Sequence, residues 1–217
     1  MEGATGAKFM TERSTLEALN KSLFVWIHSP AGTSSILDGF AMGWAITGPY
    51  LLVIMFVGLW FRADHIGKKA LVQATLTSLV GLGLNQLVGL YYFHSRPFMV
   101  GLGEPLFSHS PETSFPSDHA TLMFSASFSL LLISRKISWG LWLLAFSLFT
   151  AWGRVFSGVH FPFDMAGSLA VAFTAATLLW SLPERYEKLV IAIAHNIDRM
   201  IAASFDLVYS FVKKCFR

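Results

Sequence analysis

Long apolar runs, each bounded by polar or charged residues, constrain this sequence more than any other feature. A hydrocarbon core needs about 20 apolar helical residues to cross it. Five runs approach or exceed that length: residues 36–61, 70–93, 117–133, 139–156 and 162–182. Charged residues make up only 13% of the 217 residues, against about 25% in an average soluble domain. The sequence therefore predicts an all-α, polytopic membrane bundle of about five spans.

The two ends of the chain are more polar. Residues 1–13 are expected to be a disordered lead, and residues 15–28 repeat leucine and isoleucine at the spacing of an interfacial amphipathic helix. Residues 184–217 alternate apolar and charged positions, which predicts an amphipathic helix lying on the membrane or against the bundle. A sixth span there is the alternative, but it would bury several charges. We interpret residues 1–217 as one integral-membrane domain with its motif-bearing core at 36–182.

Basic residues gather on one face of the predicted bundle. Lysine and arginine are frequent in the loop 62–69, the turn at 135–136 and the tail. The opposite loops, 94–116 and 157–161, have Arg96 as their only basic residue besides histidine. The positive-inside rule makes the first face cytoplasmic and the second periplasmic or exterior. The net charge of +3 is too small to indicate a nucleic-acid partner.

Three polar clusters interrupt the apolar pattern. They are His-Ser-Arg-Pro at 94–97, Ser-Phe-Pro-Ser-Asp-His at 114–119, and the stretch that contains Arg154, His160 and Asp164. Because successive helices alternate in direction, all three clusters are expected on the second face. Ionisable groups are costly near a bilayer, so these side chains are candidates for function.

The residue types in these clusters fit phosphoryl transfer. Arg96 and Arg154 are permanent, planar cations suited to bidentate contact with phosphate oxygens. Ser117 opens a helix, where backbone N–H groups favour an anion. These three residues are therefore the candidate phosphate ligands.

Two histidines complete the predicted site. His160, oriented by Asp164, offers a nucleophile that can form a phosphohistidine, and the carboxylate would hold one tautomer of the ring. His119 offers the proton that the leaving oxygen needs. Together with the cations, these groups predict a phosphatase site on the second face.

The same residues resemble the phosphatidic-acid-phosphatase type 2 superfamily of lipid and acid phosphatases. Its signature has three parts: Lys, six residues, Arg-Pro; then Pro-Ser-Gly-His; then Ser-Arg, five residues, His, three residues, Asp. Here the parts fall on residues 89–97, 116–119 and 153–164, and the resemblance covers about residues 36–182. It implies a phosphatase without metal or other cofactor, in which His160 is the nucleophile, His119 the acid, Asp164 its orienting carboxylate, and Arg96, Ser117 and Arg154 the phosphate ligands.

Three positions depart from this signature. Gly89 stands at the lysine position, Asp118 at the glycine before His119, and Gly153 at the serine before Arg154. The form Phe-Pro-Ser-Asp-His is similar to that of bacterial undecaprenyl-diphosphate phosphatases of the bacitracin-resistance type. This resemblance implies a polyisoprenyl diphosphate lipid substrate, hydrolysed to the monophosphate carrier on the outer face of the bacterial cytoplasmic (inner) membrane. We group Asp118 with the substrate-binding residues and expect it to face away from the substrate, capping the third span.

Other functions would use the same residues. A phosphatase or phosphotransferase could act on phosphatidic acid, phosphatidylglycerol phosphate or lipid A. The missing lysine at Gly89 motivates a further alternative, a non-catalytic lipid-binding or transport protein. The nearly uncharged middles of the second and fourth spans count against it, because transporters keep charges there.

The other polar side chains are interpreted as solvated, and the alternative for Glu104 and Glu112 is that they orient water or substrate. His94, His109, Glu104 and Glu112 are interpreted as solvated loop residues. His195, Asp198 and Arg199 are interpreted as the wet face of the tail helix.

Overall fold

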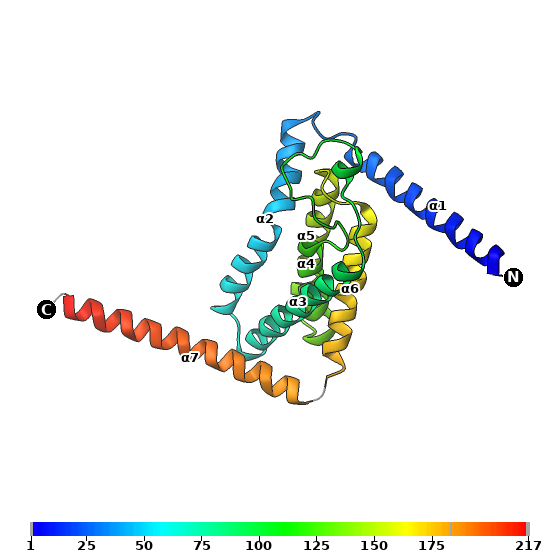
Figure 1. Cartoon of the computed structure of the whole chain (residues 1–217). Helices are drawn as coiled ribbons and strands as arrows, with labels where there is room; N and C mark the ends of the chain where they lie inside the picture. Colours follow the sequence, from blue (N-terminus) through cyan, green and yellow to red (C-terminus); the bar gives the residue numbers. More distant parts are fainter. Residues whose placement is uncertain (1, 183, 216–217) are drawn as a thin grey trace.

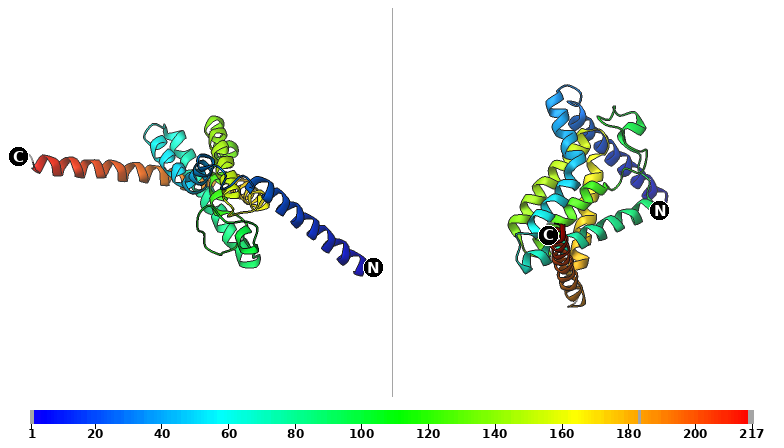
Figure 2. Two further views of the ribbon diagram at one scale, coloured as in Figure 1. Left: turned by 90° about the horizontal axis from the view of Figure 1, so that it is seen from above. Right: turned by 90° about the vertical axis from the view of Figure 1, so that its left-hand side faces the viewer.

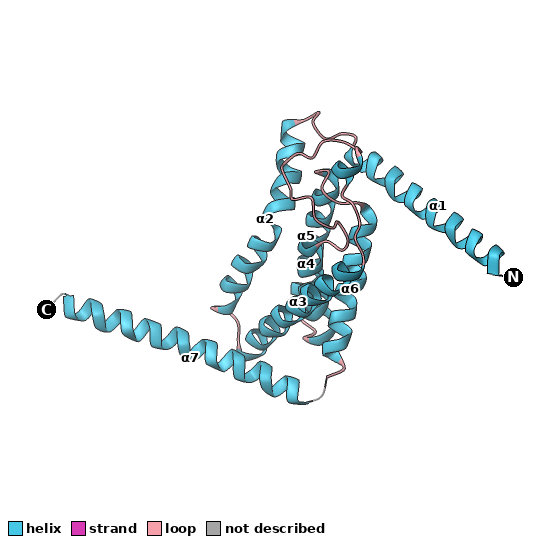
Figure 3. Ribbon diagram, in the orientation of Figure 1, coloured by secondary structure: helices cyan, strands magenta, loops and turns pink. Residues whose placement is uncertain are grey.

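The computed structural model describes residues 2–182 and 184–215, as helices joined by loops (Figure 1, Figure 3). The helices are α1 (Glu2–His28), α2 (Ser35–Trp60), α3 (His65–Tyr91), α4 (Asp118–Phe128), α5 (Ile137–Phe156), α6 (Pro162–Trp180) and α7 (Glu184–Cys215). A 3₁₀ turn, η1 (Pro97–Val100), lies between α3 and α4, and a π-helical turn, η2 (Ser129–Ile133), continues α4. The described residues form no strand, which confirms the all-α prediction.

The helices α2, α3, α5 and α6 are long and apolar enough to cross a membrane. The helix α4 and its continuation η2 form a shorter apolar helix, Asp118–Ile133. These five helices match the five predicted spans, so the polytopic bundle is confirmed. The helix α3 tilts away from the others, and the long loop that follows it returns to the bundle (Figure 2).

The helix α4 lies among its neighbours α3, α5 and α6. Small side chains at Ala120, Ser125 and Ala126 are buried on it, and small residues let neighbouring helix backbones approach closely in a membrane. Met123 and Leu130 fill the remaining space against apolar residues of α2, α3 and α5. This packing fixes the start of α4, where two predicted site residues lie.

Gly153 marks a close approach between α5 and α2. A Cβ built at Gly153 would lie 2.6 Å from the carbonyl oxygen of Ala41 and 3.0 Å from the backbone nitrogen of Ala45. Both atoms belong to the backbone of α2 and cannot rotate away. The glycine at the signature's serine position is therefore required by helix packing, and the next residue, Arg154, is placed against α2.

We expect Gly153→Ser to destabilise the protein, because the added side chain would push α2 and α5 apart. Overpacking of this kind costs about 1–3 kcal/mol, which lowers the midpoint of thermal unfolding in detergent. Gly58→Ser is the matched control, since a Cβ at Gly58 would meet nothing within 4 Å. Equal unfolding midpoints for the two variants would contradict this explanation.

The helix α1 packs at the end of the bundle that holds the site loops and projects sideways from it (Figure 1, Figure 2). Phe24 and Asn20 are buried on its inner face, whereas Leu16 and Trp26 are exposed on its outer face. The structure confirms a helix over residues 15–28, and its position at the membrane interface stays a prediction. The helix begins at Glu2, so the expectation of a disordered lead is wrong from that residue onward; alanine, lysine, glutamate and arginine there are good helix formers.

The helix α7 lies across the opposite end of the bundle rather than alongside the spans (Figure 1). Val190, Ile193, Ile197 and Ile201 pack on α2 and α3, and this arrangement speaks against a sixth span. Asp198 stays partly exposed on the wet face, and its carboxylate also accepts hydrogen bonds from Trp60 Nε1 at 3.1 Å and Lys68 Nζ at 2.7 Å. His195 remains exposed as expected.

Candidate active site

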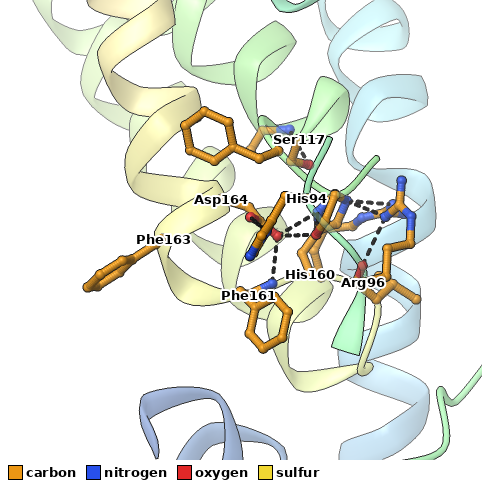
Figure 4. A network of polar contacts seen from close by, with 12 residues as sticks. His94, Arg96, Ser117, His160, Phe161, Phe163 and Asp164 are labelled. Atoms are coloured by element: carbon orange, nitrogen blue, oxygen red, sulfur yellow. Dashed lines mark hydrogen bonds and ion pairs between the residues drawn. The ribbon is translucent and has the colours of Figure 1, made fainter. Parts of the chain in front are cut away.

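The structure brings the three predicted clusters together at one end of the bundle. Cluster 94–97 follows α3, cluster 114–119 leads into α4, and His160 lies in the turn between α5 and α6 (Figure 4). The long loop 92–117 reaches the α5–α6 turn, where Leu106 N donates to Ser157 O at 3.0 Å. The three clusters also contact one another directly, as in Arg96 Nη1 with His160 Nε2 at 3.1 Å and Ser114 with Asp164. They therefore lie together as expected, and their use as one catalytic site stays a prediction.

The turn that carries His160 is set by its neighbours in sequence. Gly158 adopts φ +81°, a left-handed conformation that favours glycine, and Pro162 starts α6 with its ring at the first helical position. Asp164 follows in the first turn of α6, where its Oδ2 accepts from the Phe161 N–H at 2.7 Å. The same carboxylate oxygen lies 3.3 Å from His160 Nδ1.

The contacts of His160 define its tautomer. Its Nε2 lies 3.1 Å from Nη1 of Arg96 and 3.2 Å from Nη2 of Arg154. Guanidinium groups only donate, so Nε2 carries the lone pair and Nδ1–H donates to Asp164. Burial lowers the pKa of His160 to about 3, with both arginines acting in the same direction against Asp164. A neutral ring with an unprotonated Nε2 is the form that a nucleophile requires.

Arg96 and Arg154 are buried cations, only 5% and 3% exposed. Arg96 donates to the carbonyl oxygens of Val159 at 2.9 Å and Thr113 at 3.1 Å, and Arg154 donates to Ala45 O at 3.5 Å. Among the described residues, no carboxylate oxygen lies within 4 Å of either guanidinium, and both Nε atoms lack a partner. Two uncompensated buried cations side by side favour an anion between them.

A cavity of about 270 Å³ opens beside these cations. Its lining includes Gly89, Arg96, His109, His119, Arg154 and His160. His119 is half-buried near the start of α4, and the described residues give its imidazole no hydrogen-bond partner. At Gly89 an added Cβ would meet only the Thr113 methyl carbon at 3.6 Å. The cavity therefore has free space at residue 89, the position where the signature has lysine.

Ser117 and Asp118 differ from the expectation. Ser117 is the helix cap of α4, because its hydroxyl accepts from Ala120 N at 3.5 Å, and it is fully buried outside the cavity lining. Its backbone N–H donates to Ser168 Oγ at 2.9 Å. Asp118 follows the cap and is not the cap itself. Its Oδ1 accepts from Asn85 Nδ2 at 2.9 Å, and the residue lines the cavity rather than facing away from it.

Two histidines interpreted as solvated from the sequence belong to the site. His94 Nδ1 lies 3.2 Å from Asp164 Oδ1, and His109 Nε2 lies 2.8 Å from Arg154 Nη2. Ser114, which sequence reasoning gave no role, donates to Asp164 Oδ2 and lies 3.4 Å from His160 Nδ1. Glu104 and Glu112 stay exposed, although Glu112 borders the cavity.

We expect Arg96→Lys to lower kcat/KM about 10- to 100-fold, although the charge is kept. The guanidinium lies within hydrogen-bond distance of Thr113 O, Val159 O and His160 Nε2. An ammonium group cannot donate to all three atoms and to a phosphate at the same time. Initial rates of phosphate release across substrate concentrations check this expectation. Arg199→Lys, the same change at an exposed arginine of α7, is the matched control. An Arg96→Lys enzyme with wild-type kcat/KM would contradict it.

The fold and the cavity define a class: a helical membrane protein with a buried site fitted to a phosphate-like anion next to a histidine lone pair. The model of the PAP2 superfamily matches residues 70–188, more than half of the chain. The chain belongs to this superfamily, and the protein is a multi-pass membrane phosphatase.

Curated relatives support this assignment. "Undecaprenyl-diphosphatase BcrC" of Bacillus subtilis is 34% identical over 75% of this chain and 83% of its own length. "Putative undecaprenyl-diphosphatase YbjG" of Escherichia coli is 29% identical over 76% of this chain and 84% of its own length. "Bacitracin transport permease protein BcrC" of Bacillus licheniformis is 30% identical over 76% and 82%. The last name describes a transport protein rather than a phosphatase.

Two solved structures share the fold. LpxE of Aquifex aeolicus superposes with a TM-score of 0.58 at 22% identity, over 74% of this chain and 93% of that one. A transmembrane PAP2-type phosphatidylglycerolphosphate phosphatase of Bacillus subtilis gives a TM-score of 0.57 at 20% identity, over 76% and 84%. At these identities the similarity establishes the arrangement of helices only.

Proposed function

We propose that this membrane phosphatase hydrolyses undecaprenyl diphosphate to undecaprenyl phosphate through a phosphohistidine at His160. One observation carries the proposal. The lone pair of His160 Nε2 lies between two buried guanidinium groups that have no carboxylate partner within 4 Å in the part of the chain that the structure describes. A terminal phosphate that enters the cavity would satisfy both cations and bring its phosphorus next to the nucleophile.

The proposed reaction has two in-line steps. In the first, His160 Nε2 forms a bond to the terminal phosphorus while the bond from phosphorus to the bridging oxygen breaks, and His119 gives its proton to that oxygen. In the second, His119 takes a proton from water, and the oxygen of that water attacks the phosphohistidine. The bond from nitrogen to phosphorus breaks, and inorganic phosphate leaves.

The other site residues have roles that their contacts support. Asp164 holds the Nδ1–H tautomer of His160 and stabilises the imidazolium that forms when Nε2 is phosphorylated. Arg96 and Arg154 would bind the equatorial oxygens. Ser117 would act through the positive end of α4, and Asp118 would face the substrate's outer part from the cavity wall.

The choice of lipid rests on the relatives and on the position of the cavity. Two relatives carry the name undecaprenyl-diphosphatase, and one of them reaches 34% identity. Gln86 and Gly89 of the spanning helix α3 line the cavity, so a polyisoprenyl tail could stay in the bilayer while its diphosphate reaches the arginines. Lys68 and Lys69 lie at the opposite end, where they pair with Asp198 and Glu187 of α7, which supports a site on the exterior face of the bacterial cytoplasmic membrane.

Phosphate release from the purified protein in detergent with EDTA tests this proposal. The substrates are undecaprenyl diphosphate, farnesyl diphosphate, phosphatidic acid, phosphatidylglycerol phosphate and a lipid A phosphate. We expect release from the two polyisoprenyl diphosphates, undiminished by EDTA. Preference for a glycerolipid or lipid A would keep the chemistry and overturn the substrate. No phosphate release from any of the five substrates would favour a binding or transport protein.

A further inference from the structure

The carboxylate of Asp164, which orients His160, accepts hydrogen bonds on both of its oxygens. Its Oδ2 accepts from the Ser114 hydroxyl, the Phe161 N–H and His160 Nδ1. Its Oδ1 has one partner among the described residues, His94 Nδ1 at 3.2 Å (Figure 4). Asp164 is 0% exposed, so its oxygens depend on partners inside the protein. His94 therefore decides whether Oδ1 is satisfied and how the carboxylate is turned toward His160.

His94 is fixed in place by its backbone and by its ring. Its N–H donates to Thr113 Oγ1 at 3.1 Å, and its carbonyl oxygen accepts from Ser114 N at 2.7 Å. The imidazole lies 5.2 Å from the ring of Phe161 and stacks on Tyr92 at 6.1 Å. The side chain therefore has one orientation, in which Nδ1 faces Asp164 and Nε2 faces outward.

The outward nitrogen meets the interfacial helix. His94 Nε2 lies 3.7 Å from Glu17 Oε2 of α1. The helix α1 is attached to both sides of the His160 turn: Asn20 Oδ1 accepts from Phe163 N at 3.0 Å, and His28 Nδ1 donates to Phe156 O at 2.8 Å. Because these contacts anchor α1 on the turn, Glu17 is held beside His94.

We propose that His94 is a positioning residue for the Asp164–His160 pair, and that Glu17 of α1 holds it in a charged, donating form. The chain of contacts runs from Glu17 through His94 and Asp164 to His160. The proposal rests on the roles of His160 and Asp164 proposed above. It adds two residues that the signature does not specify: His94 stands at one of the unspecified positions of the first motif, and Glu17 lies outside the matched residues 70–188.

The charges around His94 give the proposal a pH dependence. Asp164 faces it from α6 and Glu17 from α1, with Lys21 3.4 Å from Glu17; Arg96 and His160 lie beyond Asp164. The hydrogen bond to Asp164 raises the pKa of His94, burial opposes the rise, and Glu17 adds to it. A raised pKa means that the cation is present at lower pH and is lost as the pH rises. Turnover that depends on the His94 cation is therefore expected to fall as the pH rises.

Two substitutions at His94 separate hydrogen bonding from packing. His94→Phe keeps a ring for Tyr92 and Phe161 but has no donor. His94→Asn loses the ring, but its Nδ2 stands the same number of bonds from the backbone as Nδ1 of histidine. We expect His94→Phe to lower kcat about 10-fold or more with little change in KM, because a buried carboxylate oxygen loses its partner. His94→Asn should recover most of that loss near neutral pH.

The third variant tests the link to α1. Glu17→Gln should move the alkaline limb of the kcat profile to lower pH, because removal of the carboxylate lowers the pKa of His94. In His94→Asn the same Glu17→Gln change should have no effect on that limb. Glu104→Gln is the matched control, since Glu104 is an exposed carboxylate of the neighbouring loop.

The assays use the full chain in detergent with farnesyl diphosphate, and each variant's thermal unfolding shows whether it is folded. His160→Gln is measured in parallel. If His160→Gln keeps turnover, the proposed function fails first. If His160→Gln is inactive, the inference is overturned by a folded His94→Phe with wild-type kcat, by equal losses in the Phe and Asn variants, or by an alkaline limb that Glu17→Gln leaves in place.

Discussion

Replacement of His160 by glutamine is expected to lower phosphate release about 10³-fold or more. The reason is that Nε2 of His160 is the nitrogen lone pair that lies between the two guanidinium groups. Glutamine can fill part of the buried volume and accept from the arginines, so the fold should persist. The measurement is the initial rate on farnesyl diphosphate, together with thermal unfolding in the same detergent.

The control for this prediction is His195→Gln, which removes an exposed histidine of α7 far from the cavity. It should retain the wild-type rate. His109 lines the same cavity as His160, so a His160→Gln enzyme that kept substantial turnover would redirect the search for the nucleophile toward His109 or His119.

Asp164→Asn is expected to lower kcat by about 10³-fold, by analogy with the orienting carboxylate of serine-protease triads. The carboxylate accepts from every partner that it has, namely His94, Ser114, Phe161 N–H and His160. An amide can turn only one oxygen to them. If the NH₂ of the new asparagine faces His160 Nδ1, the neutral ring must carry its proton on Nε2 instead. That N–H would then point at the N–H donors of Arg96 and Arg154. The nucleophilic lone pair would then be lost.

KM should change little in Asp164→Asn, because this residue lies behind the cavity and is not among its lining residues. The amide oxygen can still accept from the Phe161 N–H, so the start of α6 should hold. Asp206→Asn, on the exposed half of α7, is the matched control. A large rise in KM with unchanged kcat would contradict an orienting role for Asp164.

The spans and the gathering of the motifs could be predicted from the sequence, because both depend on local patterns. Apolar length defines each membrane helix, and alternation of helix direction then places residues 94–97, 114–119 and 154–164 on one face. The spacing of His160, Pro162 and Asp164 likewise fixed their contact, since a helix that begins at Pro162 has Asp164 in its first turn.

The residues that the sequence did not predict depend on tertiary contacts. His94 and His109 lie in loop 92–117, whose path is set by hydrogen bonds to α6 and α5 rather than by any local pattern. The expectation that Asp118 would cap its helix failed, because Ser117, one residue earlier, competes for the same role. Asp198 accepts hydrogen bonds from Trp60 of α2 and Lys68 of α3, and these partners are more than 120 residues away in the sequence.

Trapping the phosphorylated protein is the most direct test of a phosphohistidine at His160. The purified protein is mixed with farnesyl diphosphate that carries labelled terminal phosphate, quenched in alkaline detergent, and mapped by peptide. We expect label that is stable in base and labile in acid, bound to His160 and absent from His160→Gln. Label on another residue, or equal label in His160→Gln, would contradict it.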